Sequence, residues 1–307
     1  MIQIRHVSKS FGGVKAVDNI SFDVNPGEIL GFLGPNGAGK STSMKMITGF
    51  LAMDVGEISV CGFDVQTQTR SAQQQIGYLP EGAPCYEDMT TRQFLEFVAE
   101  IRGFRKREKA RRVESVIENM NLESVWDQRI GTLSKGFKRR VGLGQALLHD
   151  PRVLILDEPT DGLDPNQKHH VREMIRGLSQ DKIVIISTHI LEEVTAVCTR
   201  AMIIDDGRVV KDCTPAELEA RSRFHGAVTV ELGNPAGSRH LFAGLSQVEQ
   251  VEVDELNSRI TLFARHGMSI INQVTNKVHE QQLDVEGIYV ERGRLDDVFR
   301  SVTRGDT

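Results

Sequence analysis

The chain has 307 residues, of which 39% are hydrophobic and 26% are charged, a composition typical of globular proteins and a length sufficient for two domains. Its 37 Lys and Arg against 42 Asp and Glu give a formal net charge of −5, which argues against a general nucleic-acid binder, because such proteins depend on cations that meet phosphates. Four separated cysteines without a C-x-x-C pair indicate neither a zinc site nor a disulfide framework, and we expect reduced thiols in a cytosolic protein.

The first part of the chain predicts strands and helices in alternation. Apolar and polar residues alternate over 2–24 and a turn follows at 25–28, so we expect paired strands there, and the apolar run 29–33 predicts a strand buried on both faces. Further along, helical spacing and short apolar runs define six more elements. The helices are predicted at 41–48, 91–101, 108–120 and 141–148, and the strands at 153–156 and 183–186. This alternation predicts an α/β fold with a mainly parallel sheet.

The composition changes after residues 214–220. From about residue 224 the pattern predicts a strand, a helix, two strands, a helix and a strand, and a last helix includes the segment LDDVF. A βαββαβ order can close into a ferredoxin-like sandwich. We therefore expect a first domain over 1–220 and a small α+β accessory domain over 221–307.

No segment of the chain is expected to cross a membrane. The apolar runs VLIL and IVII have the length of strands, and the sequence begins without the apolar core of a signal peptide. We therefore expect a protein that is neither inserted nor exported.

The segment GPNGAGKST fits the phosphate-loop pattern G-x4-G-K-[ST], and it lies between a predicted strand and a predicted helix. In this context, glycines let successive N–H groups turn toward a polyphosphate at the start of a helix. Lys40 would reach the β- and γ-phosphates and Ser41 would bind Mg²⁺. The alternative is an ordinary glycine turn. The candidate nucleotide-binding residues are Gly34, Pro35, Asn36, Gly37, Ala38, Gly39, Lys40, Ser41 and Thr42.

The segment VLILDEPT supplies two carboxylates at the end of a buried strand, the edge at which open α/β sheets bind ligands. Asp157 would hold the magnesium ion, and Glu158 would orient and polarise the attacking water. The alternative is a pair of solvated carboxylates at a strand end. Together with the phosphate loop, these residues predict a nucleotide hydrolase.

ATP is the expected nucleotide. A Ras-like GTPase would need the base-reading motif N-K-x-D, and the nearest string in this chain is NKVH at 276–279, in the other predicted domain. The phosphate motifs do not indicate what hydrolysis drives.

The chain also has a wider resemblance, which depends on six segments in a fixed order. These segments are SKSFGGVKAV, GPNGAGKST, GYLPE, LSKGFKRR, VLILDEPTDGLD and ISTHILEE. Over roughly residues 1–220 the chain resembles the nucleotide-binding subunit of an ABC transporter. The resemblance implies a P-loop NTPase fold of the ABC type, with an antiparallel β subdomain and a helical subdomain over about 85–150.

The resemblance implies roles for residues outside the phosphate motifs. Phe11 stands where the family stacks an aromatic ring on adenine, although a core Phe is the alternative. LSKGF corresponds to the family's LSGGQ, with Ser134 and Gly136 kept and Lys135 and Phe137 substituted. In ABC dimers this segment contacts the nucleotide held by the other subunit, which implies a homodimer with two equivalent sites. Outside that context, Ser134 would be a helix N-cap.

Three further positions carry over from the family. His189 matches the switch histidine that contacts the γ-phosphate, although a structural histidine is the alternative. Asp164 matches the loop that crosses the dimer interface, and an N-cap before Pro165 would explain it equally well. Glu81 stands where most of the family has Gln as a Mg²⁺ contact; a carboxylate is still an oxygen ligand, and Glu at this position is frequent in exporters.

The leading hypothesis is the ATPase subunit of an ABC-2-type exporter. The segment LPEGAPCYEDMTTRQFLEF and the accessory domain resemble the gliding-motility-associated and nitrous-oxide-reductase-maturation ATPases and antibiotic exporters. This implies a separately encoded permease and a position on the inner face of the cell membrane. Two alternatives remain: an importer ATPase with a C-terminal regulatory domain, and a soluble ABC ATPase acting on a ribosome or nucleic acid. The 117 positions between Lys40 and Asp157 leave no room for the long coiled coil of repair-type members.

Overall fold

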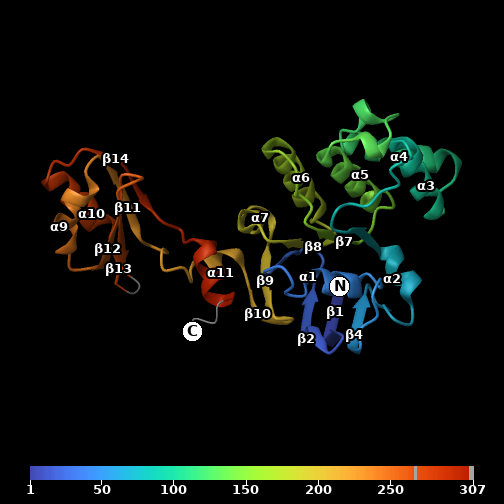
Figure 1. Cartoon of the computed structure of the whole chain (residues 1–307), viewed down its shortest axis with the longest axis horizontal. Coiled ribbons are helices and arrows are strands. Elements are labelled where there is room, and N and C mark those ends of the chain that lie inside the picture. The colour runs from blue at the N-terminus through green and yellow to red at the C-terminus, as the bar shows by residue number, and fades with distance from the viewer. Residues whose placement is uncertain (266–267, 304–307) are drawn as a thin grey trace. The chain divides into compact units, whose positions relative to one another are not determined.

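The computed structural model describes residues 1–265 and 268–303 (Figure 1). The chain forms two compact units, Met1–Pro215 and Ala216–Thr307, and each is described by itself. Among the described residues, no helix combines the length and the apolar character needed to cross a bilayer.

The first unit begins with an antiparallel sheet in the order β2-β1-β4-β5. Its strands are β1 (Ile2–Phe11), β2 (Val14–Val24), β4 (Val55–Val60) and β5 (Phe63–Asp64). Strands β1 and β2 pair with Ile2 opposite Val24 and Ile4 opposite Phe22, and the side chains of all four residues are buried on one face. The prediction of paired strands over 2–24 is confirmed.

A second sheet of six strands has the order β10-β9-β3-β8-β7-β6, and all neighbours are parallel except β10 and β9. The strands are β3 (Ile29–Leu33), β6 (Ile76–Leu79), β7 (Val153–Asp157), β8 (Ile183–Thr188), β9 (Arg200–Asp205) and β10 (Arg208–Cys213). Successive residues of β7 belong to two cores: Leu154 and Leu156 pack on one face, and Val153 and Ile155 on the other. Burial on both faces explains the unbroken apolar runs in the sequence.

Seven α-helices surround these sheets: α1 (Lys40–Ile47), α2 (Thr69–Gln75), α3 (Thr91–Ile101), α4 (Lys106–Asn119), α5 (Lys135–Leu147), α6 (Pro165–Leu178) and α7 (Leu191–Val197). Two short 3₁₀ turns lie at Glu123–Val125 and Ile130–Thr132. Figure 1 shows α3, α4 and α5 gathered in one group. Gly144 lets α4 and α5 approach closely, because a Cβ there would lie 2.6 Å from a methyl carbon of Val116.

Helix α5 is longer than the helix that the hydrophobic spacing alone predicted from residue 141, and it agrees with the alternative of Ser134 as an N-cap. It begins at Lys135, because the side chain of Ser134 accepts a hydrogen bond from the backbone N–H of Phe137 and so caps the helix. The first turns carry a glycine and several cations, and this composition hides the helical period from the hydrophobic pattern. The helix predicted at 91–101 is observed with those bounds.

The second unit contains α8 (Pro215–Glu219, whose first residue closes the first unit), β11 (Val228–Leu232), α9 (Pro235–Ala243), β12 (Val248–Asp254), β13 (Arg259–Ala264), α10 (Ile271–Glu280), β14 (Val285–Val290) and α11 (Leu295–Thr303). Its antiparallel sheet has the order β12-β13-β11-β14. Phe242 of α9 and Val274 of α10 pack with Val230 and Ile260 in one core. The predicted βαββαβ order is confirmed.

Candidate functional site

The phosphate loop connects β3 to α1, and its backbone is pressed against the rest of the first unit. A Cβ at Gly34 would lie 2.4 Å from the carbonyl oxygen of Ile204, and a Cβ at Gly39 would lie 2.3 Å from that of Ala16. Gly39 also has φ +102°, which L side chains rarely adopt. Both positions therefore require glycine, and the loop is fixed between β9 and β2. The residues between them include the exposed Pro35, Asn36 and Gly37 and the buried Ala38.

Lys40, the first residue of α1, points back over this loop. Its ammonium group donates hydrogen bonds to the carbonyl oxygens of Gly34 at 2.7 Å and Pro35 at 3.0 Å, and its side chain is buried. Burial lowers the pKa of Lys40, and the attraction of Glu158 and Asp157 opposes this shift. A cation held beside N–H groups at the start of a helix favours a polyphosphate.

Oxygen atoms suited to a hard cation lie beside Lys40. Asp157 ends β7, is buried, and accepts a hydrogen bond from the hydroxyl of Ser187 on β8. Ser41 and Thr42, both partly buried, form the first turn of α1 with further hydroxyl groups. Carboxylate and hydroxyl oxygens are the donors that Mg²⁺ prefers, so this donor set could hold that ion.

Glu158 adopts an unusual backbone conformation, with φ +50°. Left-handed backbone at a non-glycine residue costs roughly 1–3 kcal/mol and persists only where neighbours enforce it. The N–H of Glu158 donates to the carbonyl of Ser187 at 3.0 Å, and its own carbonyl accepts a hydrogen bond from the guanidinium of Arg139. Its side-chain Oε1 lies 2.8 Å from Nδ1 of His189, a residue whose side chain is about half exposed. Lys40, Asp157, Glu158 and His189 are called the phosphate cluster below.

The hydrophobic and motif patterns did not single out two residues that hold this cluster. Arg139 of α5 is buried; burial lowers its pKa, whereas the carboxylates of Asp161 and Glu158 act to raise it. Glu193 of α7 is also buried, and it accepts a hydrogen bond at 2.8 Å from Thr188, the residue before His189. A buried charge is costly unless it has a partner. The partner of Arg139 lies 19 positions away and that of Glu193 five positions away, and neither pair follows a recognised motif spacing, so the tertiary fold reveals these roles.

Ser134, Gly136 and Asp164, called the signature end below, meet at the junction of α5 and α6. Ser134 and Asp164 are exposed N-caps, and Asp164 accepts a hydrogen bond from the N–H of Gln167 at 2.9 Å. Gly136 is buried against α6, because a Cβ there would lie 2.3 Å from Oε1 of Gln167. The capping alternatives considered for Ser134 and Asp164 are therefore observed, and the contacts of the signature end lie apart from the phosphate cluster of the same chain.

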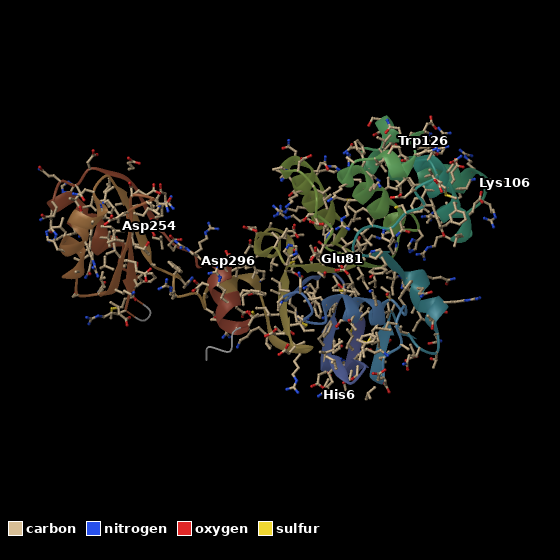
Figure 2. The ribbon with its side chains drawn as sticks, viewed as in Figure 1. His6, Glu81, Lys106, Trp126, Asp254 and Asp296 are labelled. Carbon is tan, nitrogen blue, oxygen red and sulfur yellow. The ribbon has the colours of Figure 1, made fainter. Side chains whose placement is uncertain are left out.

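Two other predicted residues lie on the surface. Phe11 ends β1 and is 50% exposed, so the alternative of a core phenylalanine is wrong; the ammonium group of Lys9 lies 5.6 Å from its ring centre. Glu81, which Figure 2 labels, is exposed just after β6, on the connection to α3. Its charge acts on Lys40, which brings it into the electrostatic surroundings of the phosphate cluster.

A groove of about 930 Å³ lies between α2, the end of β6 and α3. Large apolar side chains are exposed along it, including Phe50 at 79%, Tyr86 at 59% and Ile101 at 68%. Tyr78 of β6 also lines the groove, and burial together with the charges of Asp157 and Glu81 raises its pKa to about 12. One wall of the groove is therefore within electrostatic reach of the phosphate cluster.

Comparisons with known proteins agree with this geometry. Residues 17–161 match the family model described as ABC transporter. Over 308 residues the chain is 33% identical to the linearmycin resistance ATP-binding protein LnrL of Bacillus subtilis (strain 168), covering 99% of this chain and 98% of that protein. It is 36% identical over 304 residues to the Nod factor export ATP-binding protein I of Paraburkholderia xenovorans (strain LB400), covering 98% and 96% of the two chains.

A solved structure described as the ATP-binding subunit of an ABC transporter superposes with a TM-score of 0.67 at 29% identity, covering 72% of this chain and 92% of that chain. The matching regions contain the phosphate loop and the strand that ends in Asp157, and the near-complete coverage of two relatives extends the match beyond these motifs. The chain therefore belongs to the ATP-binding proteins of ABC transporters and is an ATPase of that family.

Proposed function

We propose that the chain energises an ABC-2-type exporter by hydrolysing ATP. The observation that carries this proposal is the phosphate cluster, in which Lys40, Asp157, Glu158 and His189 meet at the carboxyl ends of parallel strands. The names of two relatives, which refer to Nod factor export and linearmycin resistance, support an exporter rather than an importer. Glu81 also supports an exporter, because Glu is frequent at this position in exporters of the family.

The residues divide the chemistry between them. The loop N–H groups and Lys40 bind the phosphates, and Ser41, Asp157 and Glu81 offer oxygen atoms to Mg²⁺, which would neutralise charge on the phosphates when bound. Glu158 accepts a proton from the attacking water. His189, hydrogen-bonded to Glu158, orients that carboxylate and faces the γ-phosphate. Phe11, exposed at the end of β1, stacks on the adenine.

The signature end contacts the ATP that is bound by a second copy of the chain. Its exposed Ser134 and Asp164 make their contacts at the junction of α5 and α6, so they are available to a partner surface. An isologous dimer then contains two equivalent ATP sites, each with a phosphate cluster from one chain and a signature end from the other. ATP binding closes this dimer and hydrolysis reopens it.

The groove between α2 and α3 is the proposed docking site of the permease, at the inner face of the membrane. Its exposed Phe50, Tyr86 and Ile101 form an apolar surface suited to a short helix from a partner. Tyr78 of β6 lines this surface and Glu81 follows three residues later, so a short stretch of backbone connects the surface with a residue proposed to bind Mg²⁺.

Substitution of Glu158 by Gln tests the proposal. The variant keeps the shape of the side chain but cannot accept the proton, so we expect ATP hydrolysis to fall by about 100-fold or more while ATP binding remains. Light scattering with Mg²⁺ and ATP should then show a stable dimer. Glu192→Gln, on the first turn of α7, is a matched control that should hydrolyse ATP normally. If Glu158→Gln hydrolyses ATP at the wild-type rate, Glu158 is not the group that accepts the proton from the attacking water.

Affinity purification of the wild-type protein from gently solubilised membranes tests the partner. A polytopic membrane protein in stoichiometric amount supports the transporter, and its recovery should fall when Phe50 and Tyr86 are changed to Ser. Ribosomal or DNA-associated proteins in its place would contradict the proposal.

A further inference from the structure

Helix α5 carries residues that point toward two different places. Its first turn holds Ser134 and Gly136 of the signature end, whereas Arg139 lies one and a half turns further and is only 4% exposed. Five residues of α-helix span about 7.5 Å, so both groups belong to one short rigid segment. A displacement of the start of α5 therefore also displaces Arg139.

The guanidinium of Arg139 reaches the backbone of Glu158. Its Nη2 donates a hydrogen bond to the carbonyl oxygen of Glu158, which also accepts one from the N–H of Asp161 at 3.2 Å. The N–H of Glu158 is held by Ser187. The left-handed conformation of Glu158 is therefore enforced from both sides, and α5 supplies one of the three hydrogen bonds.

Packing alone does not explain a cation at this place. The charges of Asp161, Glu158, Asp157 and Glu81 all act on Arg139, so it faces the phosphate cluster and its surroundings. Among the described residues, its second nitrogen, Nη1, is buried without a hydrogen-bond acceptor. An apolar side chain could fill the same space without an unsatisfied donor, and such groups in folded proteins call for a functional explanation.

We propose that Arg139 is a positioning residue that couples the two ATP sites of the dimer through α5. ATP of the partner subunit, bound at Ser134, fixes the start of α5, and Arg139 then fixes the backbone that presents Glu158 to the ATP of its own subunit. The inference deepens the proposed function and rests on it. Each site hydrolyses ATP efficiently only when the other is occupied.

Arg139→Met removes the charge and the donor while retaining an unbranched side chain. Because a misplacement of about 1 Å at a catalytic group can cost 100-fold, we expect kcat to fall by about 10- to 100-fold. KM for ATP should stay within about twofold, since Lys40 and the loop are untouched, and the Hill coefficient of hydrolysis should fall toward 1. Arg139→Lys, which retains a charged donor, should recover part of the lost kcat.

The neighbouring Arg140 provides a matched control. It donates hydrogen bonds to the carbonyls of Met120 at 3.1 Å and Asn121 at 2.9 Å and stacks on Phe137, and it makes no contact with Glu158 among the described residues. Arg140→Gln should lower the melting temperature and leave the Hill coefficient unchanged. If Arg140→Gln reproduces the kinetic signature of Arg139→Met, general packing of α5 explains both and the inference is overturned.

Introducing Arg139→Met into the Glu158→Gln variant distinguishes a failure of this inference from a failure of the proposed function. In Glu158→Gln, ATP-dependent dimer formation should survive the addition of Arg139→Met, because Arg139 acts on hydrolysis rather than on ATP binding. Failure of Glu158→Gln to slow hydrolysis would overturn the proposed function and the inference with it. If Glu158→Gln hydrolyses ATP slowly but the single variant Arg139→Met keeps the wild-type kcat and Hill coefficient, the inference alone is overturned.

Discussion

The phosphate cluster and the signature end are both proposed to contact ATP, but the fold treats them in opposite ways. In the phosphate cluster, Asp157 and Lys40 are buried and their charges act on one another across several elements. At the signature end, Ser134 and Asp164 are exposed, and each uses a side-chain oxygen atom to cap the helix that follows it. Burial fixes the geometry of the first region, whereas the second leaves two capped helix starts exposed.

In the proposed function, the catalytic machinery is therefore divided between a region that is organised within one chain and a region that contacts the ATP of a second chain. Substitutions in the phosphate cluster should abolish ATP hydrolysis whether or not the dimer forms. Substitutions in the signature end should leave ATP binding to the monomer intact and should lower only the hydrolysis that requires the dimer. Substitutions in the first region should therefore cost more activity than substitutions in the second.

Lys40→Met should abolish measurable ATP hydrolysis. The substitution removes the buried cation that opposes the phosphate charge, and loss of one preorganised donor at a reacting centre costs about 100- to 1,000-fold. ATP affinity, measured by titration calorimetry, should fall as well. Lys45→Met, exposed near the end of the same helix, is the matched control and should behave as the wild type. An active Lys40→Met would place the reacting phosphates elsewhere.

Ser134→Ala should have a smaller effect that needs the dimer. Loss of the cap costs about 1 kcal/mol of stability, and loss of a hydrogen bond to a charged phosphate costs about 1.5–3 kcal/mol, or roughly 10- to 100-fold in kcat. ATP binding to the isolated monomer should not change. Activity and monomer affinity are measured separately, by steady-state hydrolysis and by titration at low protein concentration.

Thr90→Ala distinguishes the two roles of Ser134. Thr90 caps α3 through a reciprocal pair of hydrogen bonds with Gln93, so its loss should cost a similar amount of stability. Hydrolysis should be almost unaffected. Equal kinetic losses in Thr90→Ala and Ser134→Ala would mean that Ser134 matters only as a cap.

The order of the motifs was predictable from the sequence because each depends on local chemistry. The loop around Gly39 needs glycine for a positive φ and for close contact with a carbonyl, and the strand that ends at Asp157 is an unbroken apolar run because both of its faces are buried. The periodic helix at 91–101 was equally clear. Each of these features leaves a local mark in the sequence, a glycine or an unbroken apolar run, even though the contacts that require it come from other elements.

The role of Arg139 was not predictable for a physical reason. Lys138, Arg139 and Arg140 are consecutive cations that a helix directs about 100° apart, and each finds a different partner. Lys138 pairs with Glu87, Arg139 bonds Glu158, and Arg140 bonds carbonyls before α5. Nothing in the local sequence indicates which of the three is buried. The edge hairpin of β9 and β10 was missed as well, because the apolar run of β9 precedes no motif and β10 mixes charged with apolar residues.

Just after α5, the partly buried imidazole of His149 contacts strand β6, and this contact should respond to pH. His149 lies 3.0 Å from the carbonyl of Ile76 on β6, and burial, together with the nearby charge of Arg102, lowers its pKa to about 4. The unfolded chain binds a proton near pH 6.5, so the stabilisation is complete above that pH and is lost as the pH falls toward 4. The melting temperature of the wild type should drop across this interval more steeply than that of His149→Gln, which can still donate to Ile76 but cannot titrate. Parallel profiles for the two proteins would show that the anchoring of α5 does not depend on a neutral imidazole.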